Sequence, residues 1–430
     1  MKLNPRSCFV FIAVVAVLAA GCAALRPGTL PGTAGEGSGD SQDFRTEGQL
    51  QDWQTAWSAV NQNFHTAGFN GVDWSSIQKE VADRIKTGLS EEEFTALLDG
   101  TLALLNDGHT YYLDPEEADT MLRSLGDQNL TGLGLSVVKG NGNYAVIGVT
   151  FPGGPAEKAG LASHDRIHAI DGHPALGADG HPEVSRMRGP AGTKVTLLVS
   201  TPGGPMRELV LVRAQVDASA GAVKGRLLDG TGGKRIGYIL YALMPGPRAG
   251  DLLRAEFSRL SKDRPLDGLV LDLRINIGGD LEALSSSLGL FMEGTYGKDQ
   301  ARENHLKMRY ETSGAGQGNS RTVPLVVLVH QATASAAELM AGALRSAGRV
   351  RLAGQVTSGD TARSFGFRLP GGGLVSVGVA MFLHPDGSDP GWYGRGIHPD
   401  LLVPGSGWDE IYGVPDPGLQ KAVELLLRSD

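Results

Sequence analysis

The chain has 430 residues, of which 41% are hydrophobic and 20% are charged, an ordinary balance for globular domains. This length exceeds what one hydrophobic core normally holds, so we expect two or three domains. The formal net charge is -8, and no basic stripe runs along the sequence. Nucleic-acid binding depends on clustered lysine and arginine, so we expect no nucleic-acid partner.

The first 22 residues have the pattern of a targeting segment. Lys2 and Arg6 precede an apolar run at 8–20 that is too short to span a bilayer comfortably, and small residues then lead to Cys22. This pattern resembles a bacterial lipoprotein signal, which implies a lipidated Cys22, a membrane partner and a location in the cell envelope. The alternative is an ordinary secretory signal. Residues 23–42 are rich in Gly, Pro, Ser and Thr, so we expect a flexible tether.

Residues 43–130 show the spacing of an α-helical domain. Trp53, Trp57, Val60 and Phe64 recur three and four positions apart, which places them on one helix face. Helix starts are expected at Asp73 and at Ser90, and Glu93 completes a capping-box pattern with Ser90.

Residues 131–216 switch to short strands, and residues 217–430 alternate strands with helices. In the first segment, 165–172 is a strand that runs into an Asp-Gly turn. In the second, alternation of the two element types predicts an α/β layer. The expected strands are 236–241, 269–273, 325–330, 350–352 and 374–381, and the expected helices are 249–260, 281–291 and 334–347.

Six segments, in this order, resemble the C-terminal processing peptidases, also called tail-specific proteases, and their tricorn-core relatives. They are 154–161, 171–172, 187–196, 271–279, 334–338 and 384–400. The resemblance implies an α+β multidomain fold: an N-terminal helical region at 43–130, a β-rich PDZ domain at 131–216, and a C-terminal α/β peptidase core of ClpP/crotonase type at 217–430.

The PDZ resemblance implies a protein or peptide partner. The loop Gly132, Leu133, Gly134 and Leu135 can point backbone N–H groups at a peptide carboxylate, and the adjoining strand edge can accept the peptide by strand addition. The alternative is that Gly132 and Gly134 only form a turn. Four histidines at 164, 168, 173 and 181 complete no metal-ligand pattern, so we expect surface-loop residues and no metal.

Ser335 is the candidate nucleophile, because it follows an apolar strand and opens a helix whose N–H groups can stabilise an oxyanion. The resemblance implies that Gly278 or Gly279, together with Ala336, supplies these donors. The alternative is that Ser335 and Glu338 form a helix capping box.

The general base is the point at which the sequence departs from the resemblance. The family places a lysine 25 residues after the serine, where this chain has Asp360. His109 is the candidate replacement base, since an imidazole suits proton transfer near neutral pH. In the lysine-using branch a histidine at this place is structural, so both roles stay open. The tricorn branch supports its histidine with a glutamate where this chain has Tyr393.

Two functions follow from these residues. The first is a serine endopeptidase that acts on exported proteins with Ser335 and His109 and needs no cofactor. The second is an inactive pseudopeptidase that binds protein C-termini through its PDZ domain. A His109 ring nitrogen within hydrogen-bond reach of the Ser335 hydroxyl favours the enzyme. A His109 that is buried elsewhere, with Asp360 beside Ser335, favours the binder.

Overall fold

The computed structural model describes residues 38–126, 129–177, 180, 182–229, 232–302 and 307–428. The expected signal at 1–22, with Cys22, lies outside these residues, as does most of the expected tether. Helix α1 (Ser38–Asn63) begins inside the segment expected to be a tether, so residues 38–42 are helical. No helix in the described ranges is both long and apolar enough to cross a bilayer.

The N-terminal region is helical, as its spacing predicts. Asp73 caps α2 by accepting a hydrogen bond from the Ser76 N–H, and Ser90 with Glu93 forms the expected capping box of α3. Trp53 and Phe64 are fully buried between these helices. The remaining helices of this region are α2 (Trp74–Ile85), α3 (Glu91–Ala103) and α4 (Pro115–Gly126).

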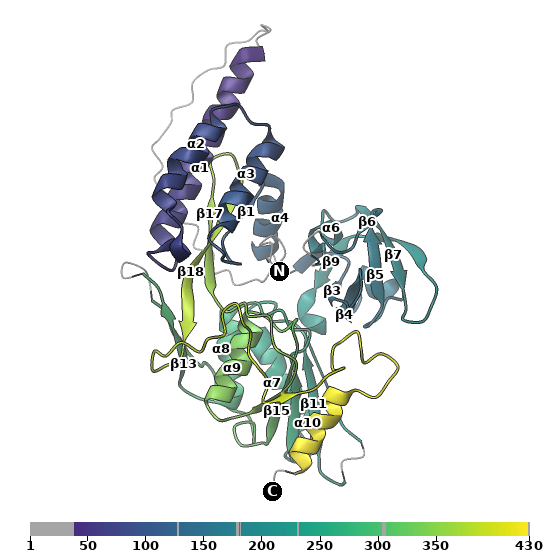
Figure 1. The fold of residues 1–430 in the computed structure, drawn as a ribbon. Helices are drawn as coiled ribbons and strands as arrows, with labels where there is room; N and C mark the ends of the chain where they lie inside the picture. The colour runs from purple at the N-terminus through teal and green to yellow at the C-terminus, as the bar shows by residue number, and fades with distance from the viewer. Residues whose placement is uncertain are drawn as a thin grey trace.

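These helices share their hydrophobic core with strands from the C-terminal half of the chain. Val375, Val377 and Val379 of β18 (Leu374–Leu383) are buried against α1–α3, and Figure 1 shows β17 and β18 rising between the helices. The strand β1 (Tyr111–Leu113) pairs antiparallel with β18. Since His109 lies two residues before β1, this pairing carries the histidine into the C-terminal core. The other strands of this sheet are β13 (Thr295–Gln300), β14 (Arg309–Glu311) and β17 (Arg363–Arg368).

The second region is an antiparallel sheet with strand order β3-β4-β5-β7-β8, in which β3 is an edge strand. The expected turn after β5 is present, with Asp171 and Gly172 at φ of 50° and 77°. The bounds are β3 (Leu135–Lys139), β4 (Ala145–Thr150), β5 (Arg166–Ile170), β7 (Lys194–Ser200) and β8 (Arg207–Val212), and β2 (Asn129–Gly132) pairs separately with β9 (Ala214–Asp217).

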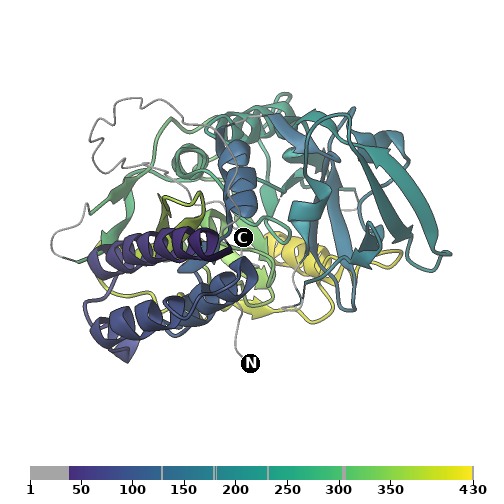
Figure 2. The same ribbon diagram turned by 90° about the horizontal axis from the view of Figure 1, so that it is seen from above.

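The C-terminal region is a six-stranded sheet with order β10-β11-β12-β15-β16-β19, and all of its pairs except β10–β11 are parallel. Helices α7 (Ala249–Leu260), α8 (Leu281–Phe291) and α9 (Ala336–Ser346) cover one face, and α10 (Pro417–Leu427) covers the other. Seen from above, the N-terminal helices and the second region lie on opposite sides of the molecule (Figure 2). The strands are β10 (Val223–Leu227), β11 (Ile236–Tyr241), β12 (Gly268–Asp272), β15 (Leu325–Val329), β16 (Arg351–Gly354) and β19 (Leu401–Leu402).

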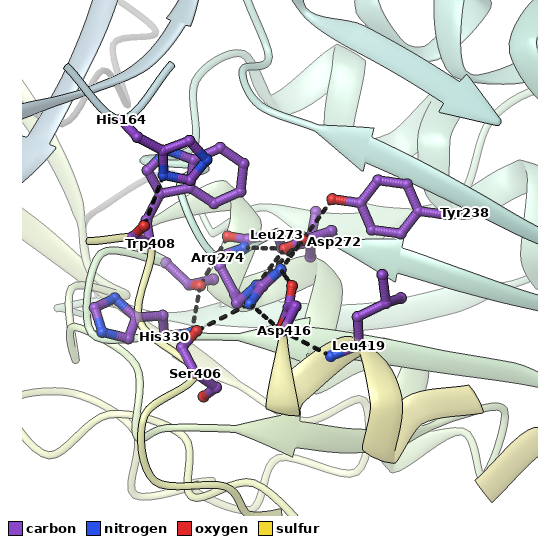
Figure 3. Close-up of polar contacts among 11 residues, drawn as sticks. His164, Tyr238, Asp272, Leu273, Arg274, His330, Ser406, Trp408, Asp416 and Leu419 are labelled. Atoms are coloured by element: carbon purple, nitrogen blue, oxygen red, sulfur yellow. Dashed lines mark hydrogen bonds and ion pairs between the residues drawn. The ribbon is translucent and has the colours of Figure 1, made fainter. Parts of the chain in front are cut away.

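A loop before α10 fastens the second region to the C-terminal core. Buried Arg274 donates to Asp272 and Asp416 and, at 2.9 Å, to the carbonyl of Ser406. In Figure 3 the loop then presents Trp408, whose indole stacks on His164 of the second region at 4.6 Å between ring centroids. His164 therefore packs at an internal contact, although the sequence predicts a free surface loop.

Candidate active site

The site forms where three neighbouring parallel strands end, which is the usual ligand position in open α/β sheets. The segment 273–279 follows β12, Ser335 lies six residues beyond β15, and Asp360 lies six residues beyond β16. Because β12, β15 and β16 are adjacent in the sheet, these three segments emerge side by side.

Ser335 occupies a strained turn at the start of α9. Its φ and ψ are 57° and -128°, a sparsely populated conformation for a residue with a side chain, and it is fully buried. The Ser335 hydroxyl has no hydrogen-bond partner among the described residues. Only the glutamate half of the expected capping box is a hydrogen bond: Glu338 accepts the Ser335 N–H at 3.1 Å, while the Ser335 hydroxyl accepts none from the described residues.

The Gly278-Gly279 turn packs directly against Ser335. A Cβ on Gly278 would lie 2.8 Å from the Ser335 Cβ and from the Ala336 nitrogen, and φ is 91°, so a side chain there is excluded. The Gly278 N–H donates to the Asn276 side chain at 2.8 Å and is not a spare donor. The N–H groups of Gly279 and Ala336 donate to no partner within the described chain.

Asn276 holds this turn and the serine turn together. Its side-chain amide donates to the Tyr241 carbonyl at 2.7 Å, and its own carbonyl accepts the Ala334 N–H at 3.1 Å. Because Ala334 precedes Ser335, Asn276 sets the spacing between the glycine turn and the serine.

Glu338 ties the serine turn to the loop that carries Asp360. Its Oε2 accepts the N–H groups of both Ser335 and Asp360, at 3.1 and 2.8 Å. Its Oε1 accepts the Thr357 hydroxyl at 2.5 Å and the Gly359 N–H at 2.7 Å. Burial raises the pKa of Glu338 to about 7, against the bonds from Thr357 and Gly359, which lower it.

Asp360 and His109 form a buried ion pair. The Asp360 Oδ1 contacts the His109 Nε2, and both side chains are less than a tenth exposed. Burial disfavours the charged imidazole, but the Asp360 carboxylate outweighs burial and raises the pKa of His109 to about 9. The structure thus places the predicted base beside the residue that stands where the family has its lysine.

No hydrogen bond joins His109 to Ser335 in the described chain. Both residues reach the same network, since His109 binds the Asp360 side chain and Glu338 binds the backbones of Asp360 and Ser335. The structure therefore links Ser335, His109 and Asp360 through one network, and the hydrogen bond from His109 to Ser335 that would favour the enzyme is not among the contacts of the described residues.

The loop predicted to bind a peptide is built as a turn between β2 and β3. The carbonyls of Leu133 and Gly134 accept bonds from Ala156 and Phe151, both at 2.8 Å. The N–H groups of Leu133 and Gly134 donate to no partner in the part of the chain that the structure describes. Leu135 then opens the edge strand β3.

Comparisons with known proteins decide the family. Residues 235–403 match the model of peptidase family S41, and residues 124–200 match the PDZ domain. The carboxyl-terminal-processing protease of Synechocystis is 32% identical over 378 residues, which cover 86% of this chain and 85% of the relative. The chain belongs to the carboxyl-terminal-processing proteases.

Further comparisons agree with this membership. The carboxyl-terminal-processing protease of Picosynechococcus is 32% identical over an alignment that covers 87% of this chain and 88% of the relative. The solved structure of the photosystem II D1 C-terminal processing protease matches 89% of this chain and 98% of its own, with a TM-score of 0.60 and 26% identity. The chain is therefore a serine peptidase with a PDZ domain, as its motifs predict.

Several residues of the site escape prediction from the sequence. The Ser-x-x-Glu spacing gives Glu338 as a cap, but its bonds to the Asp360 loop join segments 19 to 22 residues apart. Asn276 stands inside a predicted motif, yet its bond to Tyr241 crosses 35 residues. The described residues contain no cluster of His, Cys, Asp and Glu that could hold a metal.

Proposed function

We propose that this protein is an endopeptidase that processes the C-termini of exported proteins, with Ser335 as nucleophile and the His109–Asp360 pair in place of the family lysine. One observation carries the proposal. A buried serine hydroxyl that has no partner among the described residues stands in a strained turn, and Glu338 links its backbone to the loop that presents Asp360 to His109. Hydrogen bonds of a catalytic site are often long before substrate binds and shorten in the complex.

In this mechanism neutral His109 removes the proton from the Ser335 hydroxyl as the oxygen attacks the scissile carbonyl, and the imidazolium returns the proton to the leaving amine. Asp360 stabilises the imidazolium that forms. Because the resting pair holds His109 protonated up to a pH of about 9, the base form is scarce at neutral pH.

Gly279 and Ala336 are the oxyanion donors of this mechanism. Their N–H groups are unpaired among the described residues: Ala336 directly follows Ser335, and Gly279 directly follows Gly278, which packs against Ser335 and whose own N–H is held by Asn276. Two such donors aimed at the carbonyl oxygen stabilise the charge of the tetrahedral intermediate.

The PDZ domain selects substrates by their C-terminal residues in this proposal. The N–H groups of Leu133 and Gly134, which donate to nothing in the described part of the chain, suit a terminal carboxylate, and the edge strand β3 can add the preceding residues as a further strand. The alternative reading of Gly132 and Gly134 as a plain turn predicts no binding.

The test compares the wild type with Ser335→Ala on a denatured protein substrate, with mass spectrometry of the new C-termini. We expect the substitution to abolish cleavage by at least about a thousandfold with the fold intact, because the attacking oxygen is removed. Ser388→Ala, at an exposed serine that bonds within its own turn, is the matched control and should cleave normally. Equal cleavage by wild type and Ser335→Ala would exclude Ser335 as the nucleophile.

A second function, capture of protein C-termini without cleavage, is favoured by one observation. The His109 imidazole is paired with Asp360 and makes no bond to Ser335 within the described chain. In this case the wild type and Ser335→Ala bind peptides with the same Kd and neither cleaves them.

We also propose that the protein is anchored in the cell envelope through a lipid on Cys22. The support is the residue pattern at 1–22, in which small residues precede Cys22. Labelling of producing cells with radioactive palmitate should mark the wild type and Cys8→Ala but not Cys22→Ala. Equal labelling of wild type and Cys22→Ala would contradict the anchor.

A further inference from the structure

Tyr393 stands where the tricorn-like branch has an acidic residue, and it contacts the candidate base in another way. Its ring stacks on the His109 imidazole, with centroids 6.0 Å apart and planes inclined by 26°. Its hydroxyl donates to the Oδ1 of Asp107. A single side chain therefore touches the ring of His109 and an acid of the His109 loop.

Asp107 is the acid that this contact recruits. It is 4% exposed and accepts bonds from the Thr110 hydroxyl and, at 3.4 Å, from the His109 N–H, as well as from Tyr393. Because Thr110 and His109 belong to the same tight loop as Asp107, these hydrogen bonds stabilise the loop. The bond from Tyr393 connects Asp107 to another segment of the chain.

Tyr393 is placed by the same loop that carries Asp360. The Gly394 N–H donates to the Gly359 carbonyl at 2.8 Å, and the Ile397 N–H donates to the Thr357 hydroxyl at 2.7 Å. Gly359 directly precedes Asp360. The stacking partner and the charged partner of His109 are thus fixed relative to each other by backbone hydrogen bonds.

Four other ionisable groups face His109 from the elements around it. Asp360 lies on the loop after β16, Asp107 on the loop of His109 itself, and Glu338 on α9. His65, after α1, lies edge-on to Tyr393 at 6.2 Å, and neither of its ring nitrogens has a partner among the described residues. Burial lowers the pKa of His65, against the opposing effect of Asp107, so the charged form of His65 is disfavoured.

We infer that Tyr393 and Asp107 are positioning residues for His109: the phenol fixes the imidazole plane by stacking and holds the Asp107 carboxylate, so that the ring is kept against Asp360. This inference rests on the proposed role of His109 as general base. In this chain Tyr393 and Asp107 together give His109 the support that the tricorn branch obtains from a glutamate at the position of Tyr393.

The hydrogen bond from Tyr393 also weakens the electrostatic attraction between the Asp107 carboxylate and the protonated imidazole of His109. In Tyr393→Phe the ring still stacks, but the carboxylate loses a donor and attracts the imidazolium more strongly, so the pKa of His109 rises. In Asp107→Asn one negative charge near the ring is removed, so the pKa of His109 falls. A role limited to filling space predicts neither shift.

The experiment follows the His109 ring protons by NMR through a pH titration of the full chain, with assignment by comparison with His109→Ala. We expect an upward shift of a few tenths of a pKa unit in Tyr393→Phe and a downward shift of about one unit in Asp107→Asn. The acidic limb of kcat/KM should move in the same directions, with KM unchanged.

Tyr412→Phe is the matched control, since Tyr412 is 41% exposed and its ring lies beside a different histidine, His164. An unchanged His109 pKa in Tyr393→Phe and Asp107→Asn, as in Tyr412→Phe, would overturn the inference. If Tyr393→Phe does not fold, Asp107→Asn alone decides. If both variants shift the pKa of His109 but the wild type cleaves no substrate, the proposed function is contradicted and the positioning of His109 by Tyr393 and Asp107 stands.

Discussion

At the scale of single residues, the exchange of lysine for Asp360 changes the chemistry of proton transfer. A lysine at this place can accept the serine proton itself, whereas a carboxylate is a weak base for a hydroxyl. The structure pairs Asp360 with His109 instead, so the acid and the imidazole form one unit. The cost of this arrangement is a resting state in which the imidazole already carries its proton.

Asp360→Asn tests this pairing through the pH dependence of cleavage. The Asp360 carboxylate raises the pKa of His109 to about 9, so the wild-type kcat/KM should increase as pH rises through about 9, when the neutral imidazole appears. Without the carboxylate, burial dominates and the pKa of His109 falls. We expect the midpoint to move to lower pH by at least about one unit while the maximal rate drops.

The readout is the pH profile of kcat/KM on a fluorogenic peptide. Asp386→Asn is the control, because Asp386 bonds within its own turn to Ser388. A midpoint that stays at the wild-type value in Asp360→Asn would show that the pair does not govern the base.

At the scale of elements, α9 joins the serine turn to the loop after β16 through Glu338. This carboxylate receives four hydrogen bonds from one serine turn and one neighbouring loop. The loop after β16 has no helix or strand of its own between Gln355 and Ala362, so Glu338 supplies much of its order.

Glu338→Gln should therefore destabilise the protein. The amide nitrogen of glutamine cannot accept a bond, so at least one buried N–H donor loses its partner, and we expect unfolding to become easier by about 2–3 kcal/mol. Chemical denaturation followed by circular dichroism measures this loss. Glu424→Gln on the exposed side of α10 removes only a surface ion pair with Lys421 and should leave stability unchanged. Equal stability of the two variants would contradict the role of Glu338.

The helices and strands of the C-terminal core show which features the sequence alone could predict. Helices α7 and α8 and strand β11 lie at the residues that periodicity predicts, because each has a regular apolar pattern between clear breaks. The serine turn, the glycine turn and the Asp360 position follow from spaced motifs. Helix α10 and the β13–β14 hairpin are missing from the prediction, although Asp416 and Pro417 form a recognisable start for α10. The bonds of Glu338 and Tyr393 could not be predicted, because contacts between distant segments leave no local pattern.

At the scale of the whole molecule, three parts of the chain meet around the catalytic core. The N-terminal helices share a core with β18 and carry His109, while the PDZ domain is held by the loop before α10 (Figure 1). In that loop Asp409 accepts bonds from Arg166 at 3.0 Å and from Tyr144 at 2.8 Å, both in the PDZ domain. Arg274, which binds the Ser406 carbonyl of the same loop (Figure 3), lies two residues before Asn276 of the glycine turn in the sequence.

Asp409→Ala should loosen the PDZ domain from the core. The substitution leaves Arg166 and Tyr144 without their acceptor, which costs about 2 kcal/mol for a partly buried ion pair with added hydrogen bonds. Hydrogen exchange followed by mass spectrometry should show faster exchange at residues 141–170 and little change in β11 and β12. Asp386→Ala, at an exposed turn, is the control. Unchanged exchange at 141–170 would contradict the fastening role of this loop.

The most direct test of the central claim is labelling with a fluorophosphonate, which reacts with activated serines, across pH 7 to 10. We predict that the folded wild type is labelled, that labelling increases as pH rises through about 9, and that Ser335→Ala and His109→Ala are not labelled. A folded wild type that stays unlabelled at every pH, or labelling that persists in Ser335→Ala, would contradict the account of Ser335 as a nucleophile activated by the His109–Asp360 pair.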